Sequence, residues 1–431
     1  MTEPVAVNGV RGLFTRASRT LPAGTAVVAL GLGVLGIAAY VFLAVAGHAL
    51  TPADYSALSV LWVIVFAVGP GLFFPLEQEL SRVVSVRTQA GEGPGAVVAR
   101  VAILAGGVLV VLLASLTVAT PWLADRLFNG HRALVAALEL NLIALSLAHL
   151  SRGVLAGTGR FTRYGSQLAI DGALRCAAVV MLAATGAGSP TSFGFALAAA
   201  QLISVAVTAA DLVRMPAGSA VTWRQVSAGL GLLLVSTLLS QLVVNIGVVV
   251  AKLLAGDAAL AGEILSGSVL ARLPLFLYAS LQASLLPSLS RAVAAGDSAG
   301  YARQLKRGLQ IVALLGGAGM VGCAALGPTL SRLLFHRQGA LGPIDFLWLS
   351  GATTAYMVAL VLGQGTIALG QHRSQAVAWT AGFLTLLAAT AAPVSVLLKV
   401  ELGYAVGSLV VVTVLGARLA GRARATARPF G

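Results

Sequence analysis

Long apolar runs separated by short basic segments occupy almost the whole of this sequence. About 20 consecutive apolar residues suffice for a helix to cross the hydrocarbon core of a bilayer. Only 10% of the 431 residues are charged and 58% are hydrophobic, whereas a soluble domain carries about 25% charged residues. Strands of a membrane barrel are about ten residues long with alternating polarity, but these runs are continuous. The sequence therefore predicts an all-α polytopic membrane protein.

The apolar runs predict about twelve transmembrane helices in two groups of six. We expect these spans at 24–47, 57–80, 97–120, 133–156, 166–187, 193–213, 228–251, 263–286, 308–326, 344–368, 376–397 and 402–420. The resulting segments are a basic N-terminus at 1–22, an N-terminal six-helix bundle at 23–214, a linker at 215–227, a C-terminal six-helix bundle at 228–420 and a basic tail at 421–431. The loops are too short to hold an extramembrane catalytic domain.

The basic residues predict the orientation, because Lys and Arg concentrate in cytoplasmic loops. Most of the 28 Lys and Arg residues lie near the N-terminus, in every second loop and in the tail, as Arg11, Arg82 and Arg422 illustrate. We therefore expect both termini in the cytoplasm and the protein in the inner (plasma) membrane. The segment Ala44–Ala46 resembles a signal-peptide cleavage site, but the apolar run before it is longer than a typical signal core.

A faint internal repeat relates the two groups of spans. Leu80–Val83 follows the second span and Leu289–Ala292 follows the eighth, and both segments read Leu-Ser-Arg followed by an apolar residue. Gly153–Gly157 and Gly365–Leu369 end the fourth and tenth spans at a similar offset. A repeat of six spans keeps both halves in the same orientation. This predicts two bundles related by a pseudo-two-fold axis along the membrane normal, an arrangement that transporters use.

Three segments resemble the oligosaccharide flippase, or polysaccharide transporter, branch of the multidrug/oligosaccharidyl-lipid/polysaccharide (MOP) exporter superfamily. Ala49–Ser59 is similar to the short outer turn after the first span of that family, with Ser56 in place of the usual glycine. Arg152–Phe161 resembles the loop after the fourth span. The stretch from Arg272 to Arg291 resembles the eighth span and the loop behind it.

The resemblance implies a V-shaped pair of six-helix bundles that works by alternating access. The implied cargo is a polyprenyl-diphosphate-linked oligosaccharide, moved from the inner to the outer leaflet for cell-surface polysaccharide biosynthesis. Glycan polymerases or glycosyltransferases are then expected partners, together with membrane lipids. Three alternatives stay open: a multidrug or metabolite antiporter of the same superfamily, a membrane enzyme or polymerase of cell-surface glycan, and a non-transporting component of a glycan assembly complex.

Charged residues inside the spans are the first candidates for a substrate site, because charge at bilayer depth is expensive and is a functional hypothesis by default. Arg272 lies near the middle of the eighth span, two residues before Pro274 and without a charged neighbour in sequence. Its guanidinium suits a diphosphate, or it pairs with another helix through Glu139. Asp171 and Arg175 share a helix face at i,i+4, which is consistent with either a structural pair or a cavity role.

Polar uncharged residues add further candidates. Gln241 and Asn245 form an i,i+4 stripe in the seventh span, and Gln282 lies in the eighth. Such groups either join helices or contact sugar hydroxyls. Glu139, in the fourth span, is a candidate for binding a coupling ion. We expect Glu77, Glu79 and Arg82 to form an interfacial cluster at the end of the second span, and His149 to lie at an interface.

The sequence contains no sign of an enzyme. A Walker A phosphate-binding motif is absent, and the Cys and His residues lack metal-ligand spacing. We therefore expect no catalytic residues, no metal site and no cofactor. The net charge of +14 does not point to nucleic acid, because the arginines fall between apolar runs and do not form one basic face with interleaved aromatics.

Overall fold

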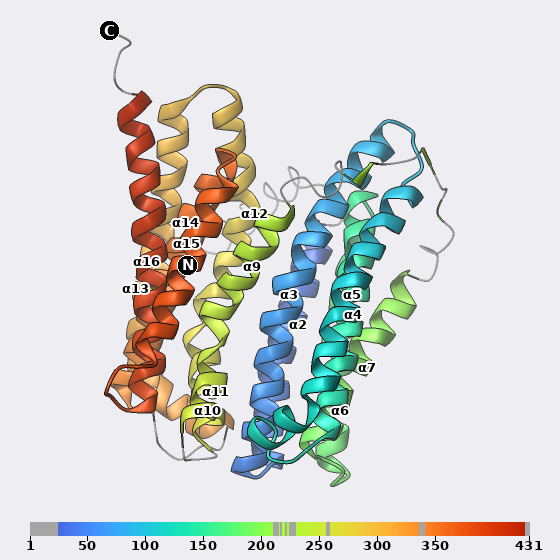
Figure 1. Cartoon of the computed structure of the whole chain (residues 1–431), viewed down its shortest axis with the longest axis vertical. Helices are drawn as coiled ribbons and strands as arrows, with labels where there is room; N and C mark the ends of the chain where they lie inside the picture. The colour runs from blue at the N-terminus through green and yellow to red at the C-terminus, as the bar shows by residue number, and fades with distance from the viewer. Residues whose placement is uncertain are drawn as a thin grey trace, which may run out of the picture.

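The computed structural model of the chain describes residues 25–209, 215, 218–219, 222–223, 230–255, 259–335 and 341–426. The described part consists of helices α2 (Thr25–Ala49), α3 (Pro52–Gln89), α4 (Gly95–Arg126), α5 (Ala133–Gly157), α6 (Phe161–Ala184), α7 (Pro190–Ala209), α9 (Leu230–Asn245), α10 (Gly247–Leu254), α11 (Leu260–Ala271), α12 (Leu273–Ala294), α13 (Ser298–Phe335), α14 (Pro343–Ala368), α15 (His372–Ala389) and α16 (Val396–Thr426) (Figure 1). The expected N-terminus at 1–22, most of the linker at 215–227 and the end of the tail lie outside the described residues.

Each predicted span corresponds to one helix or to one pair of helices. Nine of the described helices are long and apolar enough to cross a membrane, and the bent pair α9 and α10 makes a tenth. The eighth span is divided between α11 and α12. The eleventh is α15, whose first turn is the polar sequence His372–Gln375 and lowers its mean hydropathy. The all-helical, twelve-span prediction is therefore confirmed.

Several helices run beyond the apolar runs from which they were predicted. α3 continues to Gln89, α13 begins at Ser298 and α16 continues to Thr426. These extensions carry charged residues such as Arg82 and Arg303, so hydropathy alone makes the predicted helix too short. The helix of the last span continues past 420 into the segment expected to form the basic tail.

Two bundles account for most of the packing. Helices α2 to α7 form the first bundle, in which α2 packs on α6 and α3 packs on α5. Helices α9 to α16 form the second, in which α14 contacts α13 and α16, while α15 contacts α16 and α9. The bundles stand side by side in Figure 1 and meet through α3, which packs on α9 and α11.

The bundles are joined tightly at one end of the molecule, the lower end of Figure 1. We call it the outer end, after the predicted orientation, and define it by Pro52, Asn129 and Lys252. Here Tyr55 of α3 lies within 3.3 Å of the Ser266 hydroxyl of α11. A Cβ at Gly262 would meet the Tyr55 ring at 2.7 Å, so this crossing requires glycine. The first bundle is thus closed against the second at the outer end.

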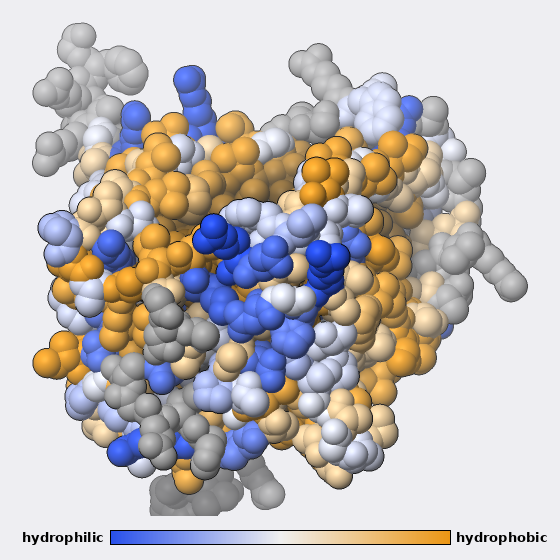
Figure 2. Space-filling model, turned by 60° about the horizontal axis from the view of Figure 1, so that its bottom comes forward, coloured by the Kyte–Doolittle hydropathy of each residue, from blue (hydrophilic) through white to orange (hydrophobic). Residues whose placement is uncertain are grey.

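The outside of the molecule is apolar along the helices. Val118, Leu314 and Val321 expose 84%, 74% and 71% of their surface. Figure 2 looks toward the outer end and shows hydrophilic side chains gathered at its centre, with hydrophobic residues around them. Large exposed apolar surface of this kind needs lipid as its solvent. This distribution agrees with a multi-pass membrane protein.

Candidate functional site

Two helix breaks lie opposite each other in the second bundle. α9 and α10 are bent by 54° at Ile246. The second break falls at Arg272, which ends α11 and precedes α12. Pro274 explains it, because proline has no N–H to donate to the carbonyl four residues earlier and its ring crowds that carbonyl. The oxygen of Leu270 accepts from a backbone N–H at the end of α11 and also from the thiol of Cys323, at 3.7 Å.

The Arg272 side chain connects the two breaks. Its Nη1 donates to Asn245 Oδ1 at 2.9 Å, and its Nη2 donates to the carbonyl of Val244. Val244 and Asn245 belong to the last turn of α9, where carbonyls lose their intrahelical donors. The Asn245 amide in turn donates to the carbonyl and side-chain oxygens of Gln241, at 2.9 Å and 3.3 Å. The structure therefore brings together Gln241, Asn245 and Arg272, three of the residues singled out from the sequence.

Tyrosines from three helices surround the guanidinium. Tyr404 of α16, Tyr356 of α14 and Tyr40 of α2 all lie within electrostatic range of Arg272. Tyr40 comes from the first bundle and donates its hydroxyl to the Val269 carbonyl of α11 at 3.0 Å. Arg272 therefore lies where the two bundles meet. Sequence reasoning missed these tyrosines, because each one is a single aromatic residue in an apolar run.

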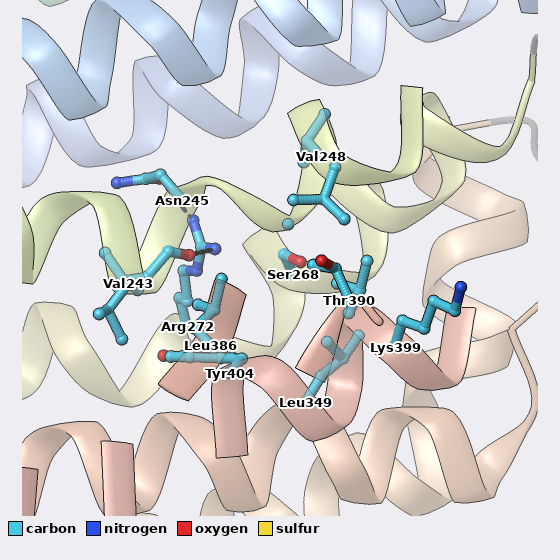
Figure 3. Close-up of a pocket in the computed structure, with 14 residues that line it drawn as sticks. Val243, Asn245, Val248, Ser268, Arg272, Leu349, Leu386, Thr390, Lys399 and Tyr404 are labelled. Carbon is cyan, nitrogen blue, oxygen red and sulfur yellow. Dashed lines mark hydrogen bonds between the residues drawn. The ribbon is translucent and has the colours of Figure 1, made fainter. Parts of the chain in front are cut away.

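A small pocket adjoins the guanidinium (Figure 3). Its polar lining comes from Asn245, Ser268, Arg272, Thr390, Lys399 and Tyr404, and Gly247, valines and leucines complete it. The free space is on the order of one water molecule. In Figure 3, Arg272 lies beside Asn245 and Tyr404, while Lys399 lies at the far end. A Cβ at Gly247 would meet Val400 Cγ1 at 2.6 Å, so glycine allows α10 to close against α16.

Arg272 is held by polar neutral groups and not by a carboxylate. Its Nε is buried and has no hydrogen-bond partner. Among the described residues no acidic side chain pairs with it, and Glu139 instead accepts a hydrogen bond from Thr117 of α4 at 2.8 Å. A buried charge without a counter-ion carries a large desolvation cost. The suggested Arg272–Glu139 pair is therefore wrong, and the charge of Arg272 has no acidic counterpart among the described residues.

Asp171 and Arg175 form a separate, closed pair in the first bundle. Arg175 Nε and Nη2 donate to the two oxygens of Asp171 at 2.7 Å and 2.8 Å. Both residues are buried, and the guanidinium stacks 5.6 Å from the ring centroid of Phe66 on α3. This bidentate arrangement satisfies the charges within one helix face. The structure does not bring the pair into the Arg272 cluster.

Gln282 also lies away from that cluster. It is half-buried on α12, ten residues beyond Arg272, which corresponds to about 15 Å along the helix.

A buried polar network in the first bundle corrects the interfacial assignment of Glu77 and His149. Glu77 is 5% exposed and His149 is 6% exposed. The carboxylate contacts His149 Nδ1 at 2.7 Å and accepts from the Tyr164 hydroxyl at 2.8 Å, with Arg152 Nε at 3.6 Å. This network joins α3, α5 and α6. Glu79 makes the expected pair with Arg82, at 2.6 Å.

Comparison with known proteins gives relatives without assigned roles. No protein family profile matches the chain. An uncharacterised protein of Mycobacterium bovis is 25% identical over 391 residues, covering 87% of this chain and 86% of the relative. An uncharacterised protein of Mycobacterium tuberculosis is 25% identical over 355 residues, covering 79% and 78%. The similarity extends along most of both chains.

Solved structures give a closer match in architecture. The inward-facing structure of a multidrug resistance MATE family transporter of the MOP superfamily matches with a TM-score of 0.72 and 14% identity, over 92% of this chain and 95% of that one. An outward-facing structure matches at 0.66 and 14% identity, over 94% and 95%. A MOP superfamily transporter from Pyrococcus furiosus matches at 0.64 and 14% identity, over 93% and 95%. The chain therefore has the fold of the MATE-type transporters of the MOP superfamily, with two six-helix bundles related by a pseudo-two-fold axis.

Proposed function

We propose that this protein is a flippase that moves a polyprenyl-diphosphate-linked oligosaccharide across the membrane by alternating access. The observation that supports this cargo is Arg272, a half-buried guanidinium at the junction of the bundles that has no acidic partner among the described residues and a buried, unsatisfied Nε. The fold supports a transporter, and the sign of the charge in its interior favours an anionic cargo. The oligosaccharide itself is proposed from the resemblance of Ala49–Ser59, Arg152–Phe161 and the eighth span to the flippase branch.

The geometry of Arg272 suits a diphosphate headgroup. A guanidinium offers a planar fork of N–H donors that binds phosphate oxygens in pairs. In this structure two of its nitrogens are held by Asn245 and Val244. An incoming headgroup would replace these neutral acceptors with charged ones, which form stronger hydrogen bonds. The side-chain oxygen of Asn245 then becomes free to accept from a sugar hydroxyl.

The pocket must widen before it admits such a headgroup, since its present space is on the order of one water molecule. The two helix breaks supply the means. A break transfers bending to a few residues while the flanking helices stay rigid, so α10 and α11 can move relative to α9 and α12. Access is proposed from the end opposite the closed outer end. The higher TM-score with the inward-facing transporter supports this assignment.

A multidrug antiporter is the second candidate, because two of the solved structures with this fold are described as multidrug resistance transporters. A cationic drug would favour an unpaired acidic side chain at the junction of the bundles. The group found there is basic. The Pyrococcus furiosus transporter, described as having a binding pocket of reversed polarity that suggests a different function, supports inferring the cargo class from the charge of the pocket.

A binding experiment with the purified protein in nanodiscs separates the two candidates. The probes are a polyprenyl diphosphate, the corresponding monophosphate and a lipophilic cation, and the readout is thermal stabilisation together with titrated affinity. We expect the diphosphate to bind wild type most tightly, Arg272→Lys more weakly and Arg272→Gln not measurably. Arg303→Ala is the matched control, since Arg303 is 72% exposed on α13. Preferential binding of the cation would contradict the proposed cargo and favour the antiporter. Binding of none of the probes would favour a non-transporting role.

We also propose that the protein lies in the inner membrane and that both of its termini face the cytoplasm. A reporter fused after Gly431 should behave as cytoplasmic, and one inserted at Asn129 should behave as external. The opposite pattern would reverse the assignment of the outer end.

A further inference from the structure

Two carboxyl groups meet in the outer half of the second bundle. Asp345 lies in the first turn of α14, and Glu401 lies in the second turn of α16. Their side chains are within hydrogen-bonding reach of each other. Asp345 Oδ2 also accepts from the Gly342 amide at 2.6 Å. Glu401 is 2% exposed, and its Oε1 has no hydrogen-bond partner.

The surroundings of this pair supply no compensating cation within the described structure. Among the described residues, the charged group that acts on Glu401 is Asp345. The helices that pack on α14 and α16 carry basic residues with contacts of their own: Lys252 of α10 donates to Asn129, and Arg332 of α13 donates to the Pro328 carbonyl. Lys399 of α16 lines the far end of the pocket. Two carboxylates in contact cannot both be ionised at ordinary cost, so a close pair retains one proton between them.

The acid pair is continuous with the Arg272 pocket. Val400 precedes Glu401 and Tyr404 lies one helical turn beyond it, and both line the pocket. Leu349, one turn beyond Asp345, lines it as well. The Tyr404 hydroxyl donates to Thr353 at 3.2 Å and lies within electrostatic range of Arg272. A change of charge at the pair therefore acts on the same segment of α16 that contacts the guanidinium.

We propose that Asp345 and Glu401 form a proton-binding site that is loaded from the outer end and drives transport through the Arg272 pocket. Asp345 is the half-exposed member at the end of the bundle, and Glu401 is the buried member. The carboxyls take up the shared proton when the outer end is open to an acidic phase, and they release it to the opposite side when the protein opens there. The coupling role rests on the proposed transport function, whereas the proton-binding site does not. Glu139, expected from the sequence to bind the coupling ion, accepts a hydrogen bond from Thr117 of α4 at 2.8 Å.

Infrared spectroscopy of the purified protein tests the site without any cargo. Protonated carboxylic acids have a carbonyl band that carboxylates lack. We expect such a band in wild type at neutral pH, its loss in alkaline buffer, and its absence from Glu401→Gln and Asp345→Asn. Both amides retain the shape of a neutral acid, and the Asp345→Asn side chain keeps an oxygen for the Gly342 amide, so both variants should fold. Asp125→Asn, an exposed acid at the outer end, is the control and should leave the band unchanged.

Two results would overturn the site: a band that persists in both amide variants, or a sodium-dependent thermal shift of wild type that replaces the pH response. A separate assay addresses coupling. Proteoliposomes with an imposed pH gradient should translocate the lipid-linked sugar faster than those without one, and Glu401→Gln should lose this stimulation while keeping basal translocation. Equal stimulation of wild type and Glu401→Gln would overturn the coupling role. Absence of translocation in wild type would instead contradict the proposed function and leave the infrared result standing.

Discussion

The first two spans of the two bundles differ although the repeat makes them counterparts. In the first bundle α2 and α3 are unbroken helices, and α3 runs for 38 residues through Pro70 and Pro75. In the second bundle the corresponding spans are each divided, at Ile246 and at Arg272. The corresponding spans are therefore continuous helices in the first bundle and divided helices in the second. Motion in this molecule is expected to concentrate in the second bundle.

Buried polar groups show the same contrast. In the first bundle Asp171 pairs with Arg175, and Glu77 is held by His149 and Tyr164. In the described part of the second bundle, several buried polar atoms lack partners: Arg272 Nε, Tyr278 OH, Gln371 Oε1, His372 Nδ1, Glu401 Oε1 and Ser408 Oγ. In the described part of the first bundle, the buried polar atom without a partner is Arg87 Nε, and Nη2 of the same residue donates to the Ser219 carbonyl. Unsatisfied buried groups are costly, so the described part of the second bundle carries more of this cost than that of the first.

The largest effect should come from breaking the closed pair of the first bundle. Asp171→Ala or Arg175→Ala leaves one buried charge without its partner, which costs about 3–5 kcal/mol. Each single variant should yield little folded protein, and the double variant should recover much of it. The measurement is thermal unfolding and yield in detergent. Additive losses in the double variant would show that the two side chains do not act as a pair.

Repairing a helix break should have an intermediate effect of opposite sign. Pro274→Ala restores an N–H that can reach the Leu270 carbonyl, and a proline within a helix costs about 3 kcal/mol. We expect the variant to be at least as thermally stable as wild type and to translocate more slowly, because the joint at Arg272 is stiffened. Pro70→Ala in unbroken α3 is the matched control. Faster transport by Pro274→Ala would contradict the role of the break.

The smallest effect is expected at the contact that closes the outer end. Lys252 Nζ of the second bundle donates to Asn129 Oδ1 of the first at 2.6 Å, and an exposed contact of this kind contributes about 1 kcal/mol. Lys252→Ala should therefore shift the population about fivefold toward an open outer end. Labelling of Ser266→Cys from outside, in a background without Cys176 and Cys323, measures the shift. Lys306→Ala, at the opposite end, is the control and should leave the labelling rate unchanged. A wild-type labelling rate in Lys252→Ala would show that this contact does not hold the outer end closed.

Hydropathy and spacing predicted the fold because each span must satisfy its own backbone hydrogen bonds in lipid. They also placed Asp171 and Arg175 on one helix face, where a structural pair was one of two interpretations, because that geometry is local to one helix. The sequence identified Arg272 and Asn245 as separate candidates. It did not predict their contact, because 27 residues separate them along the chain. The sequence also shows Pro274, and proline disrupts the helix that continues past it.

Other groups could not be predicted because their partners come from distant helices. Glu77 shares a helix end with Glu79, and nothing in the sequence shows that one turns inward to His149 while the other meets Arg82. Asp345 and Glu401 each resemble an ordinary polar residue near a span boundary. Only the packing of α14 on α16 brings their carboxyl groups together.

Translocation by Arg272 variants tests the central claim most directly. Lipid-linked oligosaccharide flipping is measured in proteoliposomes, with the folded protein quantified alongside. The account predicts that Arg272→Ala abolishes flipping while folded protein stays near the wild-type level, and that Arg272→Lys rescues only part of it, because Lys offers one compact charge in place of a planar fork. A structural role alone would reduce the amount of folded protein and leave the remainder active. Wild-type flipping by well-folded Arg272→Ala would contradict the headgroup-binding role of this residue.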